Sequence, residues 1–164
     1  MSHEDRVFTD RKRIADIISR ATVCRIGLIV DGAPYIIPMN FGFCDPYLYF
    51  HTSPKSAKLD QLRNSPAVCV ELDIEHELQT SALPCGWTMR YESVIGRGTA
   101  EIVSDAAEKR RGFDGIMAQY GGTAEGIPYK ALDGVAIIRI RLTGLTGRTN
   151  IRQPEQTPGD TGHQ

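Results

Sequence analysis

Residues 38–58 read Pro-Met-Asn-Phe-Gly-Phe-Cys-Asp-Pro-Tyr-Leu-Tyr-Phe-His-Thr-Ser-Pro-Lys-Ser-Ala-Lys, and this stretch decides the fold. Its first part has the aromatic and apolar composition of a β-strand. Asp45-Pro46 marks a turn, because both residues favour turn conformations. A second strand over residues 47–52 then leads directly into a helix. The stretch therefore predicts a strand–turn–strand–helix unit.

The junction between the second strand and the helix carries groups that bind phosphate. Hydroxyls, ammonium groups and the free N–H groups of a helix N-terminus are what a phosphate dianion needs. Lysines at a helix start oppose the helix dipole unless an anion joins them. A lone histidine at a strand end is more often structural, but here it adjoins the phosphate groups. With the aromatic strand able to face a flat ring, we predict a nucleotide-like cofactor held by His51, Thr52, Ser53, Lys55 and, as first choice, Lys58.

Length and composition bound the class of protein. The chain has 164 residues, 24% of them charged, and a net charge of −1. These values are typical of one globular domain without a basic excess for nucleic acid. No apolar run approaches membrane-spanning length, and residues 1–6 have no apolar signal-peptide core. We therefore expect a cytoplasmic protein that binds neither nucleic acid nor membrane.

The cysteines and histidines do not form a metal site in this reading. A zinc site needs closely spaced ligand pairs, and the chain has no Cys-x-x-Cys. His76-Glu77 resembles the start of a zinc-protease motif, but Thr80 stands where the second histidine would be. We expect reduced, structural thiols at Cys24, Cys44, Cys69 and Cys85, with Cys24 and Cys69 inside apolar strands.

The remaining periodicities predict a mainly β fold with flanking helices. We expect a helix from Asp10 to Ala21, and a second helix that opens at Pro54 with Ser53 as its cap. A third helix starts at Asp105, because Glu108 follows three residues later. Residues 74–84 read as a polar connection without a clean period. The predicted strands cover residues 23–30, 33–43, 47–52, 67–72, 86–103, the last kinked near Gly96 and Gly98, and 134–145.

Six strands joined mostly by hairpins favour a closed or nearly closed antiparallel barrel, since closure removes exposed edges. The alternating strands and helices of a Rossmann fold are absent. We assign the domain to residues 1–149. Residues 150–164 are rich in Pro, Gln, Thr, Gly and Asp, which predicts a disordered tail.

The strand from Trp87 to Gly96 is the second notable segment. Strand alternation places Trp87, Met89, Tyr91 and Ser93 on one face, and Thr88, Arg90 and Glu92 on the other. Trp87 and Tyr91 could belong to the core, with Arg90 and Glu92 on the surface. The same face could equally close over a ring or form an interface. Both readings stay open.

The order of these motifs resembles the FMN-binding split-barrel superfamily. Within it, the chain looks most like the pyridoxamine-5′-phosphate-oxidase-related group that includes the nitroimidazole-resistance (Nim) proteins. The similarity extends over roughly residues 5–147. The motifs that carry it are Cys24-Arg25-Ile26-Gly27, Pro38-Met39-Asn40-Phe41-Gly42, Leu48-Tyr49-Phe50-His51-Thr52, Lys58 and Trp87-Thr88-Met89-Arg90-Tyr91-Glu92-Ser93-Val94.

The resemblance implies a six-stranded antiparallel split β-barrel that forms a homodimer with FMN at the interface. By position, Thr52, Ser53 and Lys58 would contact the phosphate. Met39, Asn40 and Phe41 would lie along the isoalloxazine ring, with Arg25 and Ile26 near the phosphate and ribityl chain. Trp87, Arg90 and Ser93 would approach from the long strand, across the dimer. The full cofactor-binding set is Arg25, Ile26, Pro38, Met39, Asn40, Phe41, His51, Thr52, Ser53, Lys55, Lys58, Trp87, Arg90 and Ser93.

One departure from the family bears on the substrate. Pyridoxamine-phosphate oxidases end in an Arg-Leu-x-Pro segment that helps to hold the substrate phosphate, whereas this chain ends in polar residues 153–164. We do not expect it to oxidise vitamin B6 phosphates. The leading hypothesis is an FMN-dependent oxidoreductase that passes electrons from NAD(P)H or another donor to a small organic acceptor, such as a nitro-aromatic. A flavin- or haem-binding module without turnover is the alternative, and a ligand-free interaction protein is a third. No catalytic residue is assigned.

Overall fold

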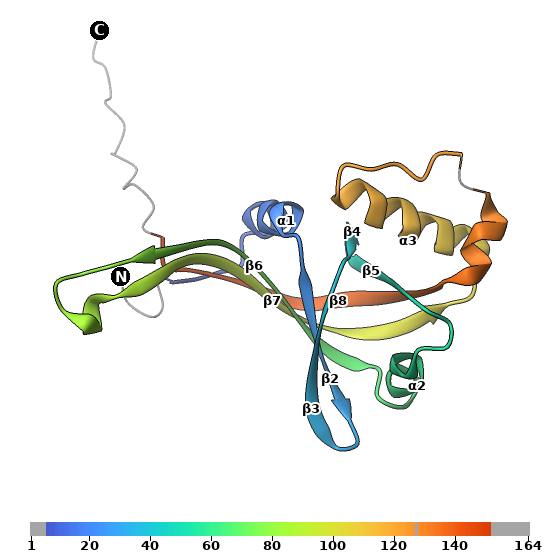
Figure 1. Ribbon diagram of the computed structural model, residues 1–164, viewed down its shortest axis with the longest axis horizontal. Coiled ribbons are helices and arrows are strands. Elements are labelled where there is room, and N and C mark those ends of the chain that lie inside the picture. Colours follow the sequence, from blue (N-terminus) through green and yellow to red (C-terminus); the bar gives the residue numbers. More distant parts are fainter. Residues whose placement is uncertain (1–5, 127, 152–164) are drawn as a thin grey trace, which may run out of the picture.

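The computed structural model describes residues 6–126 and 128–151, which form one antiparallel sheet with three α-helices (Figure 1). The sheet order is β3-β2-β6-β7-β8-β5-β4, and β1 pairs with β8. The strands are β1 (Val7–Phe8), β2 (Cys24–Val30), β3 (Ala33–Met39), β4 (Gly42–Cys44), β5 (Tyr47–Thr52), β6 (Ala67–Gln79), β7 (Thr88–Val103) and β8 (Ala136–Thr149). The helices are α1 (Arg11–Arg20), α2 (Ala57–Asn64) and α3 (Ala106–Gln119).

The mainly β fold with flanking helices is confirmed, but the sheet is not closed. Six strands have at least six residues, as expected, and β1 and β4 are short additions. Within the described residues β3 pairs only with β2, and β4 covers β5 only at residues 47–49. We call the resulting opening between β3 and residues 50–52 of β5 the split. Most of the predicted tail, residues 152–164, lies outside the described residues.

The hairpin and helix-cap signals of the sequence are realised locally. Asp31 and Gly32 both adopt positive φ, 50° and 80°, as a tight β2–β3 hairpin requires. The Asp10 side chain accepts a hydrogen bond from the Arg13 N–H, and Asp105 accepts one from the Glu108 N–H. The predicted strand over residues 33–43 is broken at Asn40 and Phe41, which link β3 to β4.

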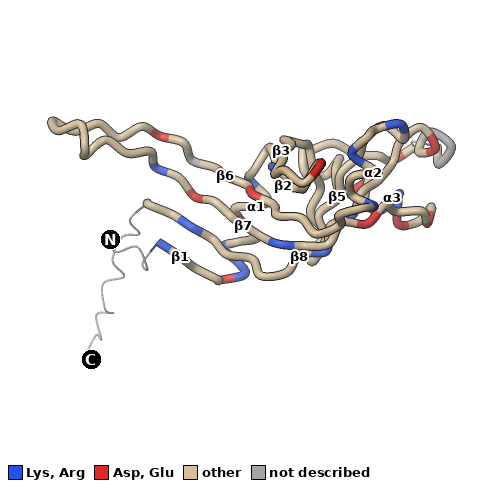
Figure 2. The backbone as a smooth tube through the Cα atoms, turned by 90° about the horizontal axis from the view of Figure 1, so that it is seen from below, with Lys and Arg blue, Asp and Glu red and all other residues tan. Residues whose placement is uncertain are grey.

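The prediction of a polar connection over residues 74–84 is wrong. Strand β6 continues to Gln79 and pairs with β7 as far as Thr88. The two strands form an arm that projects beyond the rest of the sheet in two perpendicular views (Figures 1 and 2). A ribbon without a buried face has no apolar alternation, so the sequence pattern gave no strand signal there. The predicted kink of β7 is confirmed by the register shift against β8 between Ile95 and Arg97.

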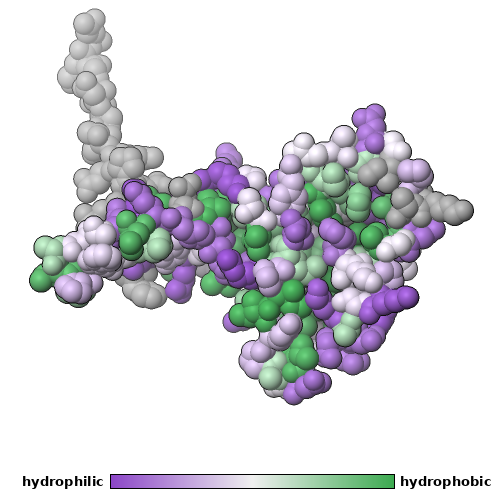
Figure 3. Space-filling model, in the orientation of Figure 1, coloured by the Kyte–Doolittle hydropathy of each residue, from purple (hydrophilic) through white to green (hydrophobic). Residues whose placement is uncertain are grey.

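Exposed apolar side chains gather at two places on the face shown in Figure 3, the arm and the β2–β3 hairpin. Leu83 and Trp87 of the arm are 66% and 53% exposed, and Ile36 of β3 is 64% exposed. Among the described residues these are unusually open positions for large apolar groups. Such patches mark interaction surfaces more often than free surface.

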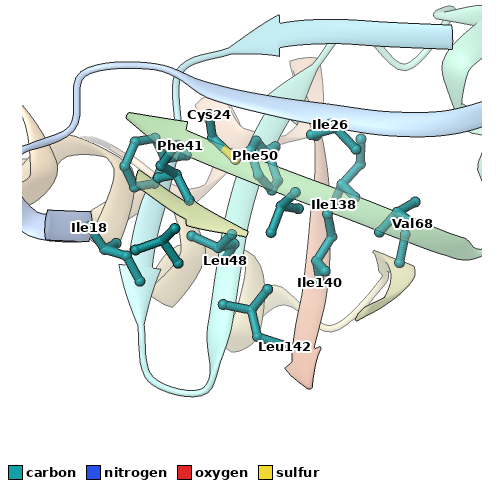
Figure 4. Close-up of a cluster of buried hydrophobic side chains, with 14 of the residues drawn as sticks. Ile18, Cys24, Ile26, Phe41, Leu48, Phe50, Val68, Ile138, Ile140 and Leu142 are labelled. Carbon is teal, nitrogen blue, oxygen red and sulfur yellow. The ribbon is translucent and has the colours of Figure 1, made fainter. Parts of the chain in front are cut away.

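The main core lies under α1 and between the curved ends of the sheet (Figure 4). Cys24 is fully buried there, and burial raises the pKa of its thiol to about 12, so it behaves as a small apolar side chain. Cys69 is exposed, which contradicts its predicted place in an apolar interior. Helix α3 packs on β4 so closely that a Cβ on Gly42 would collide with the backbone of Gly115 and Ile116.

Candidate functional site

The phosphate-binding groups lie between the end of β5 and the start of α2. The prediction that Ser53 caps the helix and Pro54 opens it is wrong, because α2 begins at Ala57 with Ser56 as its N-cap. The Ser53 hydroxyl instead accepts a hydrogen bond of 3.2 Å from the Lys55 N–H, a local turn that delays the helix. Ser56 makes no capping hydrogen bond through its side chain, so its hydroxyl is uncommitted.

The shorter helix moves Lys58 into the first helical turn, while Lys55 precedes the helix. Within residues 6–126 and 128–151, neither lysine has an ion-pair partner. Lys55 is exposed, and Lys58 and Thr52 are half-buried. Two uncompensated cations and the dipole of α2 therefore give this corner of the split a positive potential. Ser56 was missed because the capping rule also fitted Ser53.

His51 is not brought to the phosphate groups. Neighbouring residues of a strand point to opposite faces, so His51 and Thr52 diverge. The His51 ring instead packs edge-on against Phe113 of α3, with 6.3 Å between ring centroids. This contact matches the structural role that a lone histidine most often has.

The ring-binding segment divides between surface and core. Pro38 and Asn40 are exposed and Met39 is half-buried, so they border the split. Phe41 is 0% exposed, and its ring belongs to the core. The Phe41 N–H donates a hydrogen bond of 3.1 Å to the hydroxyl of Tyr120, which sequence reasoning did not connect with this segment.

Arg25 and Ile26 do not offer free groups to a ligand. Ile26 is 3% exposed and packs in the core. The Arg25 guanidinium donates to Glu71 at 3.0 Å and to Asp73 at 2.5 Å, and these bonds raise its pKa. Burial and the neighbouring Asp73 raise the pKa of Glu71. His76 extends the cluster through a contact of 2.9 Å with Asp73.

The residues predicted to form a second wall lie on or beside the arm. The Trp87 indole N–H donates to the carbonyl of Ser81 at 2.9 Å, and Arg90 pairs with Glu77 at 3.1 Å. Ser93 is 7% exposed within its own chain. The arm and α2 lie at opposite ends of the molecule (Figure 1), so the structure does not bring Trp87 to Lys58 within one chain.

Another polar network, missed by sequence reasoning, joins α3 to the sheet. The Tyr49 hydroxyl donates to Glu108 at 2.5 Å, and Arg139 donates to Glu108 at 2.9 Å and to Glu101 at 2.7 Å. Burial, followed by the bond to Glu108, raises the pKa of Tyr49 to about 12. Tyr49 therefore stays neutral at physiological pH, and the network acts as a structural anchor.

Comparison with known families and structures agrees with this geometry. Residues 10–149 match the family model described as pyridoxamine 5′-phosphate oxidase, and the chain belongs to that family. The fold is accordingly the split barrel of this family, and the resemblance stated from the sequence motifs is confirmed. No curated protein matches the chain.

The similar solved structures include a candidate 5-nitroimidazole antibiotic resistance protein from Bacteroides thetaiotaomicron. It is 33% identical with a TM-score of 0.75, and the match covers 86% of this chain and 84% of the other. The flavocytochrome Anf3 from Azotobacter vinelandii has a TM-score of 0.76 at 17% identity, with coverage of 96% and 75%. The FAD and haem binding protein from Mycobacterium smegmatis has a TM-score of 0.75 at 19% identity, with coverage of 93% and 77%.

A membrane-spanning helix was not expected. None of the helices in the described part of the chain combines the length and the apolar character that crossing a bilayer requires.

Proposed function

We propose that the chain binds FMN at the split and uses it as an oxidoreductase acting on a small organic molecule. The observation that carries this proposal is the pair of unpaired cations, Lys55 and Lys58, beside the open end of the sheet. Two family-fold relatives, the flavocytochrome and the FAD and haem binding protein, support a flavin as the ligand class.

The residues present fit a flavin monophosphate. Lys58, the Ser56 hydroxyl and the first N–H groups of α2 would hold the phosphate dianion. The half-buried Met39 and the exposed Pro38 and Asn40 would border the ring. One such group of cations at a helix start matches one terminal phosphate. This favours FMN over a dinucleotide, since the Gly-rich dinucleotide motif is absent.

Bound flavin supplies the electron-transfer chemistry, so the protein needs no nucleophile of its own. What this chain contributes is binding, orientation and shielding from water. The Tyr49–Glu108 pair is locked in a structural network, which agrees with a site that leaves chemistry to its cofactor.

A second copy of the chain is the proposed partner, with the cofactor at the interface. Exposed apolar residues on β2 and β3 support such a contact, since Ile29 is 43% exposed and Ile36 is 64% exposed. Trp87 and Arg90 would then reach the flavin of the partner subunit. Ser93 would not, because its side chain is enclosed in its own chain.

The second candidate is a flavin- or haem-binding module without turnover. It is favoured by one specific observation, namely that relatives of the same fold include a flavocytochrome and a protein that binds both FAD and haem. Both candidates share the binding step and differ in whether reduced cofactor is reoxidised by a small molecule.

Absorbance spectroscopy and calorimetry with FMN, FAD and haem test the binding step. We expect uptake of about one FMN per chain with micromolar affinity or better, and weaker binding of FAD. Anaerobic addition of NADH or NADPH should then bleach the flavin, and a nitro-aromatic or quinone should restore its colour. Failure to take up any flavin would remove the proposal, whereas uptake without reoxidation by any acceptor would favour the binding module.

A further inference from the structure

The arm, residues 77–90, is a two-stranded ribbon without support from a third strand. Its strands pair from Glu77 opposite Arg90 to Gln79 opposite Thr88. Strand β8 pairs with β7 only as far as Glu92 opposite Thr149. Asn150 adds hydrogen bonds to Thr88 and Met89 along one edge. Isolated two-stranded ribbons are marginally stable in water, so a face of the arm gains much from a covering surface.

The tip of the arm is apolar and uncharged. Residues 78–89 contain no Asp, Glu, Lys or Arg, and the tip is free of charge in Figure 2. Leu78 is 55% exposed, Leu83 66%, Trp87 53% and Met89 44%. The Trp87–Ser81 hydrogen bond fixes the tip, so these side chains are presented on an ordered loop. An ordered, uncharged apolar projection is typical of a docking element.

A second uncharged apolar surface lies on the outer face of the sheet. It is a shallow groove of about 530 Å³, and Arg97 is the one charged residue among the described residues that line it. We call it the outer groove, and it is lined by Gly27, Ile29, Pro34, Ile36, Cys69 and Arg97. Its size admits one or two large apolar side chains, such as those of Leu83 and Trp87.

Arm and outer groove lie on the same face of the sheet. Met89 is opposite Leu78, and Cys69 is opposite Arg97. Residues 89 and 97 of β7 are an even number apart, so they share a face. Two copies related by a twofold axis can therefore place each arm on the groove of the other, because such an interface uses the same patch on both.

The chain itself does not supply another cover. Apart from proline, Met1 is the one apolar residue in segments 1–5 and 152–164, which lie outside the described residues. The arm cannot fold onto its own groove, because a strand rises about 3.3 Å per residue and residues 69–79 alone span roughly 30 Å.

We propose that the arm tip of one protomer docks in the outer groove of a second copy of this chain, with Leu83 and Trp87 as anchors. This rests on the proposed homodimer and names the contact that holds it. An uncharged tip on a groove lined almost without charge avoids burying an unpaired ion. The contact is made twice, once by each arm.

Native cysteines provide a direct test, since Cys85 is exposed on the tip and Cys69 is exposed in the groove. A short bis-maleimide should link purified protein into a covalent dimer, and peptide mass spectrometry should find Cys85 joined to Cys69. Cys85→Ser and Cys69→Ser should each abolish the covalent dimer, whereas Cys44→Ser should not. Links from Cys85 to Cys85 alone, or no covalent dimer, would overturn the proposal.

Sedimentation supplies the second measurement. The double variant Leu83→Ser, Trp87→Ser should raise the dimer dissociation constant at least about thirtyfold, since buried aromatic anchors dominate interfaces. Val7→Ser, on β1 and 38% exposed, is the matched control and should leave it unchanged. A dimer that ignores the double variant would refute the arm contact alone. A monomeric wild type would refute the homodimer as well, while flavin binding is measured separately.

Discussion

The hydroxyl of Tyr120 accepts a hydrogen bond of 3.1 Å from the backbone N–H of Phe41 and donates one of 2.9 Å to the carbonyl of Thr22. Tyr120 thereby ties the β3–β4 linker to the segment that follows α1. The side-chain amide of the preceding residue, Gln119, donates to carbonyls at the end of α1, including that of Ile18 at 3.0 Å. The end of α3 thus fixes the linker at which the split begins.

Tyr120→Phe should lower the free energy of unfolding by about 1 kcal/mol, because it leaves the Phe41 N–H and the Thr22 carbonyl without this partner. Urea denaturation checks this value. Tyr35→Phe is the control, because Tyr35 is 54% exposed and its hydroxyl should contribute little. Equal midpoints for both variants would show that the Tyr120 hydroxyl does not hold the linker.

Lys58→Ala should weaken FMN binding about 10- to 150-fold, because a charge-assisted phosphate contact contributes roughly 1.5–3 kcal/mol. Titration of flavin fluorescence measures the affinity. Lys12→Ala, on the exposed side of α1, should bind FMN like the wild type. If Lys58→Ala retains wild-type affinity, the phosphate lies elsewhere.

Gly42→Ala should destabilise the fold by at least about 1–3 kcal/mol, since its methyl group would overlap the backbone of α3 at Gly115. Gly134→Ala is the matched control, because no atom lies within 4 Å of a Cβ at that position. Thermal unfolding followed by circular dichroism compares the two. A wild-type melting temperature for Gly42→Ala would mean that α3 can move away from β4.

Glu108 should make stability depend on acid pH. The hydrogen bond from Tyr49, helped by Arg139, lowers the pKa of Glu108 below its ordinary value of 4.5. The carboxylate therefore stabilises the folded state fully above about pH 4.5, and this contribution is lost as pH falls through the lowered pKa. Glu108→Gln should be less stable than wild type at pH 7, with a difference that shrinks below pH 4.5.

Unfolding curves at pH 7 and at successively lower pH measure this difference. The exposed Glu125→Gln variant should follow the wild type throughout. A gap between Glu108→Gln and wild type that stays constant down to pH 3 would argue that the Tyr49–Glu108 bond does not depend on the charge of Glu108.

Local signals in the sequence predicted the fold well. Asp31-Gly32 gave the β2–β3 hairpin, and the spacing of Asp105 and Glu108 gave the start of α3, because both signals depend on backbone chemistry within a few residues. The phosphate-binding corner was found for the same reason. Thr52 and Lys58 lie close together in the chain and remain close in the fold.

Features that depend on distant partners were not predictable. The start of α2 was misplaced because Ser53 and Ser56 both satisfy the capping rule. The role of Phe41 depended on Tyr120, a residue 79 positions away. Arg25 was expected near a phosphate, yet Glu71 and Asp73 on a neighbouring strand already neutralise it, which strand pairing alone reveals.

The openness of the sheet has a consequence for the behaviour of strand β3. Pro34 and Pro38 face Ile29 and Arg25 of β2, and proline in a strand sits where its missing N–H would point away from the ladder. Of the outward-facing positions 34, 36 and 38, only Ile36 therefore retains an N–H. An incoming strand would meet acceptors without matching donors, which discourages edge-to-edge aggregation. The two prolines thus keep this edge free for a small ligand, without inviting fibre growth.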